Sequence, residues 1–219
     1  MCKIKLIVFD FDGTLCDTQR NIVSTLKATI KKLNLPTKTD EECISIIGLP
    51  LNECFRQLFP NLDDLTIQKC ADTYRKIFAE TLANIKPSPF PYVISTVKQL
   101  KQNGYKLTIA SSRSHASLVE LTQAMGLYGD FELLLGADDV DKAKPDPYPV
   151  LKTLQITGFA PQQALVVGDM PVDIFMGNRA GATTVGVTYG NGSESILKEA
   201  GANHIINSFN EILMVLEHL

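Results

Sequence analysis

The sequence predicts a doubly wound α/β fold, in which a parallel β-sheet is covered by helices on both faces. Short apolar runs rich in β-branched residues recur along the chain, and helical patterns lie between them. One long stretch, residues 17–86, interrupts this alternation because its pattern is helical throughout. We therefore expect a small all-helical domain inserted after the first strand of the sheet.

The first predicted strand is "KLIVF", residues 5–9, and acidic residues and a glycine follow it. A continuous apolar run of this length is typical of a strand that is buried on both faces of a parallel sheet. Similar runs occupy residues 105–112, 131–138, 164–169, 183–190 and 203–207. We expect these runs to form the remaining strands.

Helices are predicted between these strands. Residues 91–104 and 114–126 carry apolar side chains at helical spacing, and each stretch ends at a glycine. The tail begins with Ser208 and Glu211, which have the spacing of a capping box, in which the two side chains accept hydrogen bonds from backbone N–H groups at the helix start. A last helix is therefore expected in the tail.

The insert also shows helical signals of its own. An apolar stripe at helical spacing is formed by Ile22, Val23, Leu26, Ile30 and Leu33. Thr39 and Glu42 have the spacing of a second capping box, and further helices are expected over 51–59 and 66–83.

These patterns predict two domains. The α/β core domain would comprise residues 1–16 and 87–219, and the helical cap domain residues 17–86. An insert of roughly 70 residues is within the usual size range of a small domain.

Composition excludes several classes of partner. The net charge of −3 argues against nucleic acid or an anionic membrane as the main partner, and no apolar stretch approaches the length of a membrane span. The five cysteines are odd in number and lack CxxC spacing, so we expect reduced thiols and a cytoplasmic location. The tail helix offers a surface for a homodimer, although its apolar stripe is explained more simply as core.

Polar residues follow four of the predicted strands. Ligands of a doubly wound sheet bind beyond the carboxyl ends of its strands, so these residues are candidates for a site. In chain order they are Asp10 and Asp12, Ser111 and Ser112, Lys144, and Asp169 with Asp173.

The residue types point to phosphate chemistry. Asp10 and Asp12 are two positions apart and point to the same side of an extended chain. Four converging carboxylates would raise one another's pKa values, and a hard divalent cation such as Mg²⁺ relieves this repulsion. Lys144, the serine hydroxyls and backbone N–H groups at a helix start would complete a phosphate cradle.

Each signal alone has a plainer explanation. "DFDG" can be a strand end and turn, Ser111 a helix N-cap, Lys144 a solvated loop residue, and Gly168-Asp169 an ordinary turn. The specificity lies in their occurring together, in order, each after a predicted strand.

"DFDGTLCDT", "ASSRS", "KPDP" and "GDMPVD" resemble, in order and spacing, the four motifs of the haloacid dehalogenase superfamily of phosphohydrolases. The resemblance covers nearly the whole chain. It implies a Rossmann-like core, and the helical insert resembles the mobile cap of that superfamily. The ending "AGATTVGVTYGNGS" is most similar to the phosphoglycolate phosphatase branch.

The resemblance also implies catalytic roles. Asp10 would be the nucleophile that forms a phospho-aspartate, and Asp12 would protonate the leaving oxygen and then activate water. Ser111, Ser112 and Lys144 would hold phosphoryl oxygens.

The metal site follows from the same resemblance. Asp10, Asp169 and the backbone carbonyl of Asp12 would ligate Mg²⁺, and Asp173 would order the shell of the metal. Family members often carry Thr or Ser where this chain has Met170, so a hydroxyl contact near the metal is lost here.

The cap gives fewer indications of the substrate. The loop around Gly48, Leu49 and Pro50 lies where such caps touch the leaving group, and it offers little recognition of charge. Arg20 and Arg56 are the arginines nearest the first hinge and this loop, and whether they meet an anionic substrate stays open. For Arg113 and His115 we expect a solvated or capping role.

The leading hypothesis is a Mg²⁺-dependent phosphatase acting on a small phosphorylated metabolite such as 2-phosphoglycolate. A phosphomutase of the β-phosphoglucomutase type, a pyrophosphatase or a nucleotidase would use the same scaffold. A signalling receiver domain also clusters Asp, Ser and Lys residues, but its acceptor Asp ends the third strand and no helical insert follows the first. A binding protein without catalysis is the remaining alternative.

Overall fold

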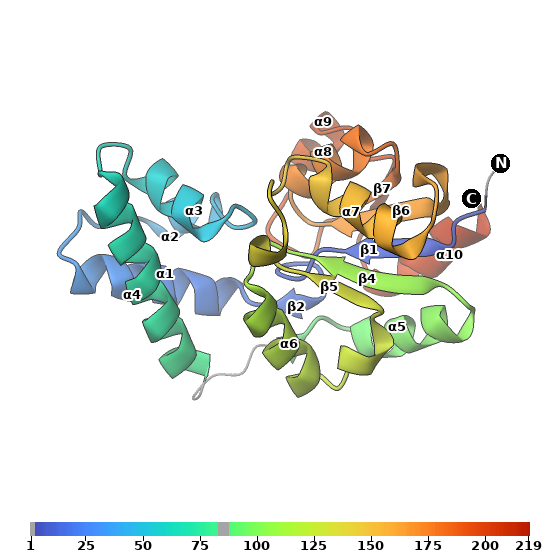
Figure 1. Ribbon diagram of the computed structural model, residues 1–219, viewed down its shortest axis with the longest axis horizontal. Helices are drawn as coiled ribbons and strands as arrows, with labels where there is room; N and C mark the ends of the chain where they lie inside the picture. Colours follow the sequence, from blue (N-terminus) through green and yellow to red (C-terminus); the bar gives the residue numbers. More distant parts are fainter. Residues whose placement is uncertain (1–2, 83–87) are drawn as a thin grey trace.

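The computed structural model describes residues 3–82 and 88–219 and shows the predicted α/β architecture (Figure 1). Six parallel strands form one sheet in the order β5-β4-β1-β6-β7-β8. Their bounds are β1 Leu6–Phe9, β4 Lys106–Ala110, β5 Leu133–Leu135, β6 Ala164–Gly168, β7 Thr183–Val187 and β8 His204–Ile206. Each lies within a predicted run, so the doubly wound fold is confirmed.

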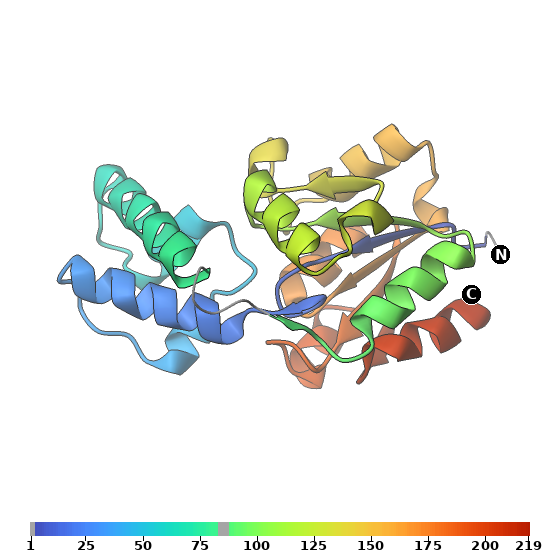
Figure 2. The same cartoon turned by 90° about the horizontal axis from the view of Figure 1, so that it is seen from below.

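Alternate residues of β1 pack on opposite faces of the sheet, as expected of a strand covered on both sides. Ile7 and Phe9 belong to the core beneath α5, α6 and α10, which lie on one face (Figure 2). Leu6 and Val8 belong to the core beneath α7 and α8 on the other face. The bounds are α5 Val93–Gln102, α6 His115–Ala124, α7 Tyr148–Thr157, α8 Pro171–Arg179, α9 Glu194–Glu199 and α10 Ile212–Glu217.

The chain between β1 and α5 forms four helices that pack on one another beside the sheet (Figure 1). They are α1 Gln19–Lys32, α2 Asp40–Ile44, α3 Leu51–Leu58 and α4 Asp64–Leu82, and we call them the helical unit. Their shared core contains Leu26, Ile30, Phe55 and Ile67. The predicted helices and apolar stripe of this region are therefore confirmed.

Two short strands connect the helical unit to the sheet. β2, Cys16–Asp17, pairs antiparallel with β3, Ser88–Pro89, and the sequence analysis missed both. The predicted domain boundary between residues 16 and 17 falls inside β2. The boundary between residues 86 and 87 lies outside the described residues, so the division into two domains stays a proposal.

The two predicted capping boxes have different outcomes. Thr39 and Glu42 form one at the start of α2, as predicted. The box at Ser208 is wrong, because its hydroxyl donates to Oδ1 of Asn210 and Glu211 accepts from the N–H of Asn207 instead. A 3₁₀ turn, Phe209–Glu211, precedes α10 there.

The described cysteines, Cys16, Cys43, Cys54 and Cys70, are free and buried, in agreement with the prediction of thiols, and Cys2 lies outside the described residues. Within residues 3–82 and 88–219, no helix combines the length and apolarity needed to cross a membrane.

Candidate active site

The central strand of the sheet delivers Asp10 to the carboxyl edge. β1 lies between β4 and β6, and the N–H of Asp10 continues this pairing by donating to the carbonyl of Val167 at 2.8 Å. The Asp10 side chain is only 7% exposed. The position of this carboxylate is therefore set by strands on both sides.

Three of the four predicted carboxylates come together at this edge. Oxygens of Asp10, Asp169 and Asp173 lie within 4.8 Å of one another. Asp169 directly follows β6, and Asp173 stands in the first turn of α8. The proximity expected from the strand ends is thus present, although these residues are far apart in the sequence.

Lys144 lies against this acidic group. Its ammonium donates to Oδ1 of Asp10 at 2.6 Å and to Oδ1 of Asp173 at 2.5 Å, and its side chain is almost fully buried. Burial alone lowers the pKa of Lys144, but the two carboxylates outweigh burial and raise it, so the lysine is charged. A solvated loop position for Lys144 is excluded.

The pKa values of Asp10 and Asp169 are raised above those of an exposed aspartic acid. Burial raises the pKa of Asp10 well above its ordinary value; Lys144 opposes this, and Asp173 and Asp169 reinforce it. Burial and the charge of Asp173 raise the pKa of Asp169 to about 7, although hydrogen bonds from Asn191 lower it. The cluster therefore holds more negative charge than Lys144 alone compensates.

Asn191 and Gly13 fix Asp169. The backbone N–H and the side-chain amide of Asn191 donate to Oδ2 of Asp169 at 2.7 and 2.8 Å, and Thr14 donates to Oδ1 at 3.4 Å. Gly13 turns with a φ of +80°, and a Cβ at this position would overlap Oδ2 of Asp169. Three carboxylates, each with two oxygens, are hard donors of the kind that a divalent cation prefers, so the residues fit Mg²⁺.

Asp12 stands apart from the acidic group. Its Oδ1 accepts from Nε and Nη2 of Arg113 at 2.9 and 2.7 Å and from the hydroxyl of Thr18 at 2.5 Å. The Asp12 side chain is therefore outside the group of oxygens that lie within 4.8 Å of one another, although it lines the same cleft as Asp10. Its predicted role as a metal ligand through the backbone carbonyl stays a prediction, and so does its role as acid and base.

The serine motif follows β4 at the same edge. Ser111 is buried, and its hydroxyl accepts from the N–H of Arg113 at 3.3 Å. Ser112 donates instead to the carbonyl of Gly48 at 2.6 Å, which joins the carboxyl edge to the helical unit. Phosphate binding by both serines stays a prediction.

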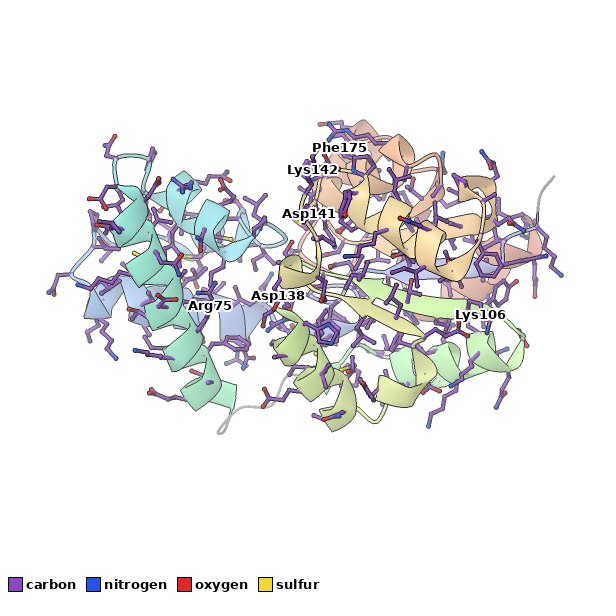
Figure 3. All side chains as sticks on the ribbon, in the orientation of Figure 1. Arg75, Lys106, Asp138, Asp141, Lys142 and Phe175 are labelled. Atoms are coloured by element: carbon purple, nitrogen blue, oxygen red, sulfur yellow. The ribbon has the colours of Figure 1, made fainter. Side chains whose placement is uncertain are left out.

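A cleft of about 780 Å³ lies between the helical unit and the carboxyl edge, and Asp10, Asp12 and Ser111 line it. Figure 3 shows Arg75 of α4 and Asp138 on facing sides of the gap, and both residues line the cleft. The cleft therefore connects the acidic group to a chamber with walls from both parts of the chain.

Arg113 differs from the expectation drawn from the sequence. Arg113 holds Asp12 and has a side chain only 10% exposed, so the expected solvated or capping role is wrong. Arg56 pairs with Asp64 and Glu53 on the surface, and Arg75, which the sequence analysis did not select, lines the cleft.

Arg20 and His115 were also considered from the sequence, and Asn191 was not. Arg20 is exposed and is not among the described residues that line the cleft. The ring of His115 pairs with Asp139 at 2.7 Å. Asn191 was also missed, and "YGNG" after β7 was the signal available, because ligands and turns gather beyond strand ends.

Known proteins are similar to this chain in sequence and fold. The family model of haloacid dehalogenase-like hydrolases matches residues 7–187. A probable phosphatase IndB from Dickeya dadantii is 34% identical over 95% of this chain and 91% of its own length, and a phosphoglycolate phosphatase from Aquifex aeolicus is 33% identical over 85% and 86%. The crystal structure of a predicted phosphoglycolate phosphatase from Haemophilus somnus superposes with a TM-score of 0.86 at 27% identity, covering 98% of this chain and 99% of that one. The chain belongs to the haloacid dehalogenase-like hydrolase family.

Proposed function

We propose that this chain is a Mg²⁺-dependent phosphatase that hydrolyses a small, phosphoglycolate-like phosphate monoester through a phospho-aspartate on Asp10. The observation that carries the proposal is the buried carboxylate of Asp10, which contacts Lys144, lies within 4.8 Å of Asp169 and Asp173, and faces the cleft. Membership of the hydrolase family and the names of its relatives support the same reaction class.

The chain's own groups would carry two linked steps. A carboxylate oxygen of Asp10 attacks phosphorus, the bond from phosphorus to the alcohol oxygen breaks, and that oxygen takes a proton from Asp12. Water then attacks the phosphorus and gives its proton to Asp12, and the bond from phosphorus to Asp10 breaks. Inorganic phosphate and the alcohol are released, and Asp12 is again protonated.

The surrounding residues would orient the phosphoryl group. Lys144 would balance charge on its oxygens, and Ser111 and Ser112 would donate hydrogen bonds to them. Asp10, Asp169, Asp173 and the backbone carbonyl of Asp12 would hold Mg²⁺. When bound, the ion would neutralise both the carboxylates and the phosphoryl oxygens.

The proposal also covers the role of the helical unit and the cellular location of the enzyme. The helical unit would act as a cap that excludes water from the cleft, and residues 17–86 would form that domain. Free cysteines and a small phosphorylated metabolite as substrate fit a cytoplasmic enzyme.

Replacing Asp10 with Asn tests the proposal. Asparagine keeps the size of the side chain but supplies no nucleophilic oxygen, so we expect release of phosphate from p-nitrophenyl phosphate to fall by at least about 10³-fold. Asp64→Asn is the matched control, because Asp64 is exposed and its ion pair with Arg56 contributes little to stability. Near-normal turnover by the Asp10 variant would end the proposal. In the wild-type protein, a trapped acyl phosphate without turnover would point to a receiver domain.

A further inference from the structure

The cleft is lined by both polar and apolar residues. At the carboxyl edge it meets Asp10, Asp12 and the serine motif, which are polar. Its wall also includes aliphatic and aromatic side chains of the helical unit, and one of these, Phe78, has the guanidinium of Arg113 4.8 Å from its ring centre. Six that line it are Ile22, Leu26, Ile47, Leu49, Tyr74 and Phe78.

The aromatic part of this wall has a defined structure. The ring of Tyr74 stacks on that of Phe78 with centroids 5.7 Å apart and meets Phe55 edge-on at 6.3 Å. These contacts fix both rings of α4 before any ligand arrives. The wall is therefore a preformed apolar surface, which favours ligands that bury apolar area.

The cations of the cleft are already engaged. Among the described residues that line it, the cations are Arg75 and Arg113 (Figure 3 labels Arg75). Arg113 is bound to Asp12 at 2.7 Å and Arg75 to Asp72 at 2.7 Å. A second anionic group on a substrate would have to displace Asp12 to reach Arg113, whereas the exposed pair with Asp72 holds Arg75 only weakly.

Two acidic side chains also disfavour a substrate with a second anionic group. Glu120 and Asp138 line the core side of the same cleft. The carboxylate of glycolate, or the second phosphate of pyrophosphate, would lose hydration on entering and would meet these like charges. A neutral alcohol with an apolar group has no charge to dehydrate and meets no like-charge repulsion. Burial of its apolar surface favours binding.

We propose that the preferred substrate is a phosphate monoester of an uncharged alcohol that carries an alkyl or aromatic group, with the phosphate at Asp10 and the apolar group against Leu49, Tyr74 and Phe78. This inference rests on the proposed phosphatase function and changes one part of it, because the alcohol is uncharged and apolar where glycolate carries a carboxylate. The size of the cleft, about 780 Å³, allows a leaving group much larger than glycolate.

A series of unbranched alkyl phosphates from methyl to hexyl tests the inference, with 2-phosphoglycolate, pyrophosphate and p-nitrophenyl phosphate assayed beside it. We expect kcat/KM to rise on the order of fourfold per added methylene, because each buried methylene gains about 0.8 kcal/mol. Hexyl phosphate should then exceed 2-phosphoglycolate by at least tenfold.

Three variants test whether the wall of the cleft causes this preference. Leu49→Ser should flatten the rise along the series, whereas Leu65→Ser should leave it unchanged, because Leu65 is 85% exposed and does not line the cleft. Ala79→Lys places an additional cation at an exposed position of α4 that lines the cleft, so it should shift preference toward 2-phosphoglycolate by about tenfold or more even if Leu49→Ser does not fold.

The outcomes separate the two proposals. Equal kcat/KM along the series, or a preference of the wild type for 2-phosphoglycolate or pyrophosphate, would overturn the apolar substrate and leave the phosphatase in place. No phosphate release from any monoester in the presence of Mg²⁺, p-nitrophenyl phosphate included, would overturn the phosphatase and the inference with it.

Discussion

Gly13 and Asp169 lie in direct contact although the chain separates them widely. The positive φ of Gly13, +80°, belongs to a region that side-chain-bearing residues rarely adopt, and a Cβ there would overlap the carboxylate of Asp169. Asn191 closes the other side of the same carboxylate with two hydrogen bonds. Asp169 therefore has one orientation available, with its position fixed relative to Asp10.

Gly13→Ala should displace Asp169 and lower phosphatase activity by on the order of 10²-fold, because misplacement of a reacting or metal-holding group by about 1 Å has that effect. The measurement is kcat as a function of Mg²⁺ concentration. Gly104→Ala is the matched control: its φ is +87°, so it pays the same conformational cost, but a Cβ there meets no atom within 4 Å. Equal activity of the two variants would contradict the prediction.

At this scale the sequence predicted the residues that follow strands and missed those brought in by tertiary packing. Asp10, Lys144 and Asp169 were found because the carboxyl ends of parallel strands share one edge. Arg113 was misread because a lone arginine after a serine motif carries no sign of its partner. Its contact with Asp12 depends on where the loop after β4 lies relative to β1.

At the scale of the elements, the close packing of α8 on the sheet determines where Asp173 lies. Gly177 lies where α8 crosses the sheet, and a Cβ there would stand 2.5 Å from Cγ2 of Thr184 and 2.9 Å from Cβ of Val166. The missing side chain lets α8 approach β6 and β7 closely. Asp173 is in the first turn of this helix, so the same approach places its carboxylate in the acidic group.

Gly177→Ala should therefore destabilise the fold, although alanine is ordinarily better than glycine in a helix by about 1 kcal/mol. Overpacking a tight interface costs about 1–3 kcal/mol, so after the gain in helix propensity we expect a net loss of up to about 2 kcal/mol in the free energy of unfolding by urea. Gly129→Ala provides the comparison, since a Cβ at that glycine meets nothing within 4 Å. A Gly177 variant as stable as the wild type would show that α8 can move without cost.

Element types were predictable where a pattern was long enough to read. The six buried runs and the helices of the insert were found in this way. β2 and β3 were not, because a strand of two residues has no period, and its existence depends on the distant segment that pairs with it. Ser208 failed as a capping residue because the N–H of Glu211 donates to the backbone carbonyl of Ser208 in a 3₁₀ turn, and the carboxylate of Glu211 accepts from the N–H of Asn207.

In the whole molecule, the helical unit contacts the carboxyl edge through a few polar links. One is the hydroxyl of Ser112, which donates to the carbonyl of Gly48. Gly48 and Leu49 belong to the loop that lines the cleft. The link therefore holds that loop of the helical unit over the edge where Asp10 lies.

Ser112→Ala should raise KM by about 2- to 10-fold while changing kcat little, because one hydrogen bond contributes about 0.5–1.5 kcal/mol. Steady-state kinetics with p-nitrophenyl phosphate measures both constants. Ser45→Ala is the control, since its hydroxyl donates to the carbonyl of Glu42 within the helical unit. A large fall in kcat would instead favour the predicted contact of Ser112 with phosphate.

The paired strands β2 and β3 carry the chain out to the helical unit and back at a single place. Because the insertion leaves and returns through paired residues, Asp17 and Ser88, its two ends stand one strand spacing apart. Between these ends it meets the carboxyl edge again at Gly48, whose carbonyl accepts a hydrogen bond from Ser112. Under the proposed function, exchanging the segment between Asp17 and Ser88 would change substrate preference, while the strands that hold Asp10 and Asp169 keep their order.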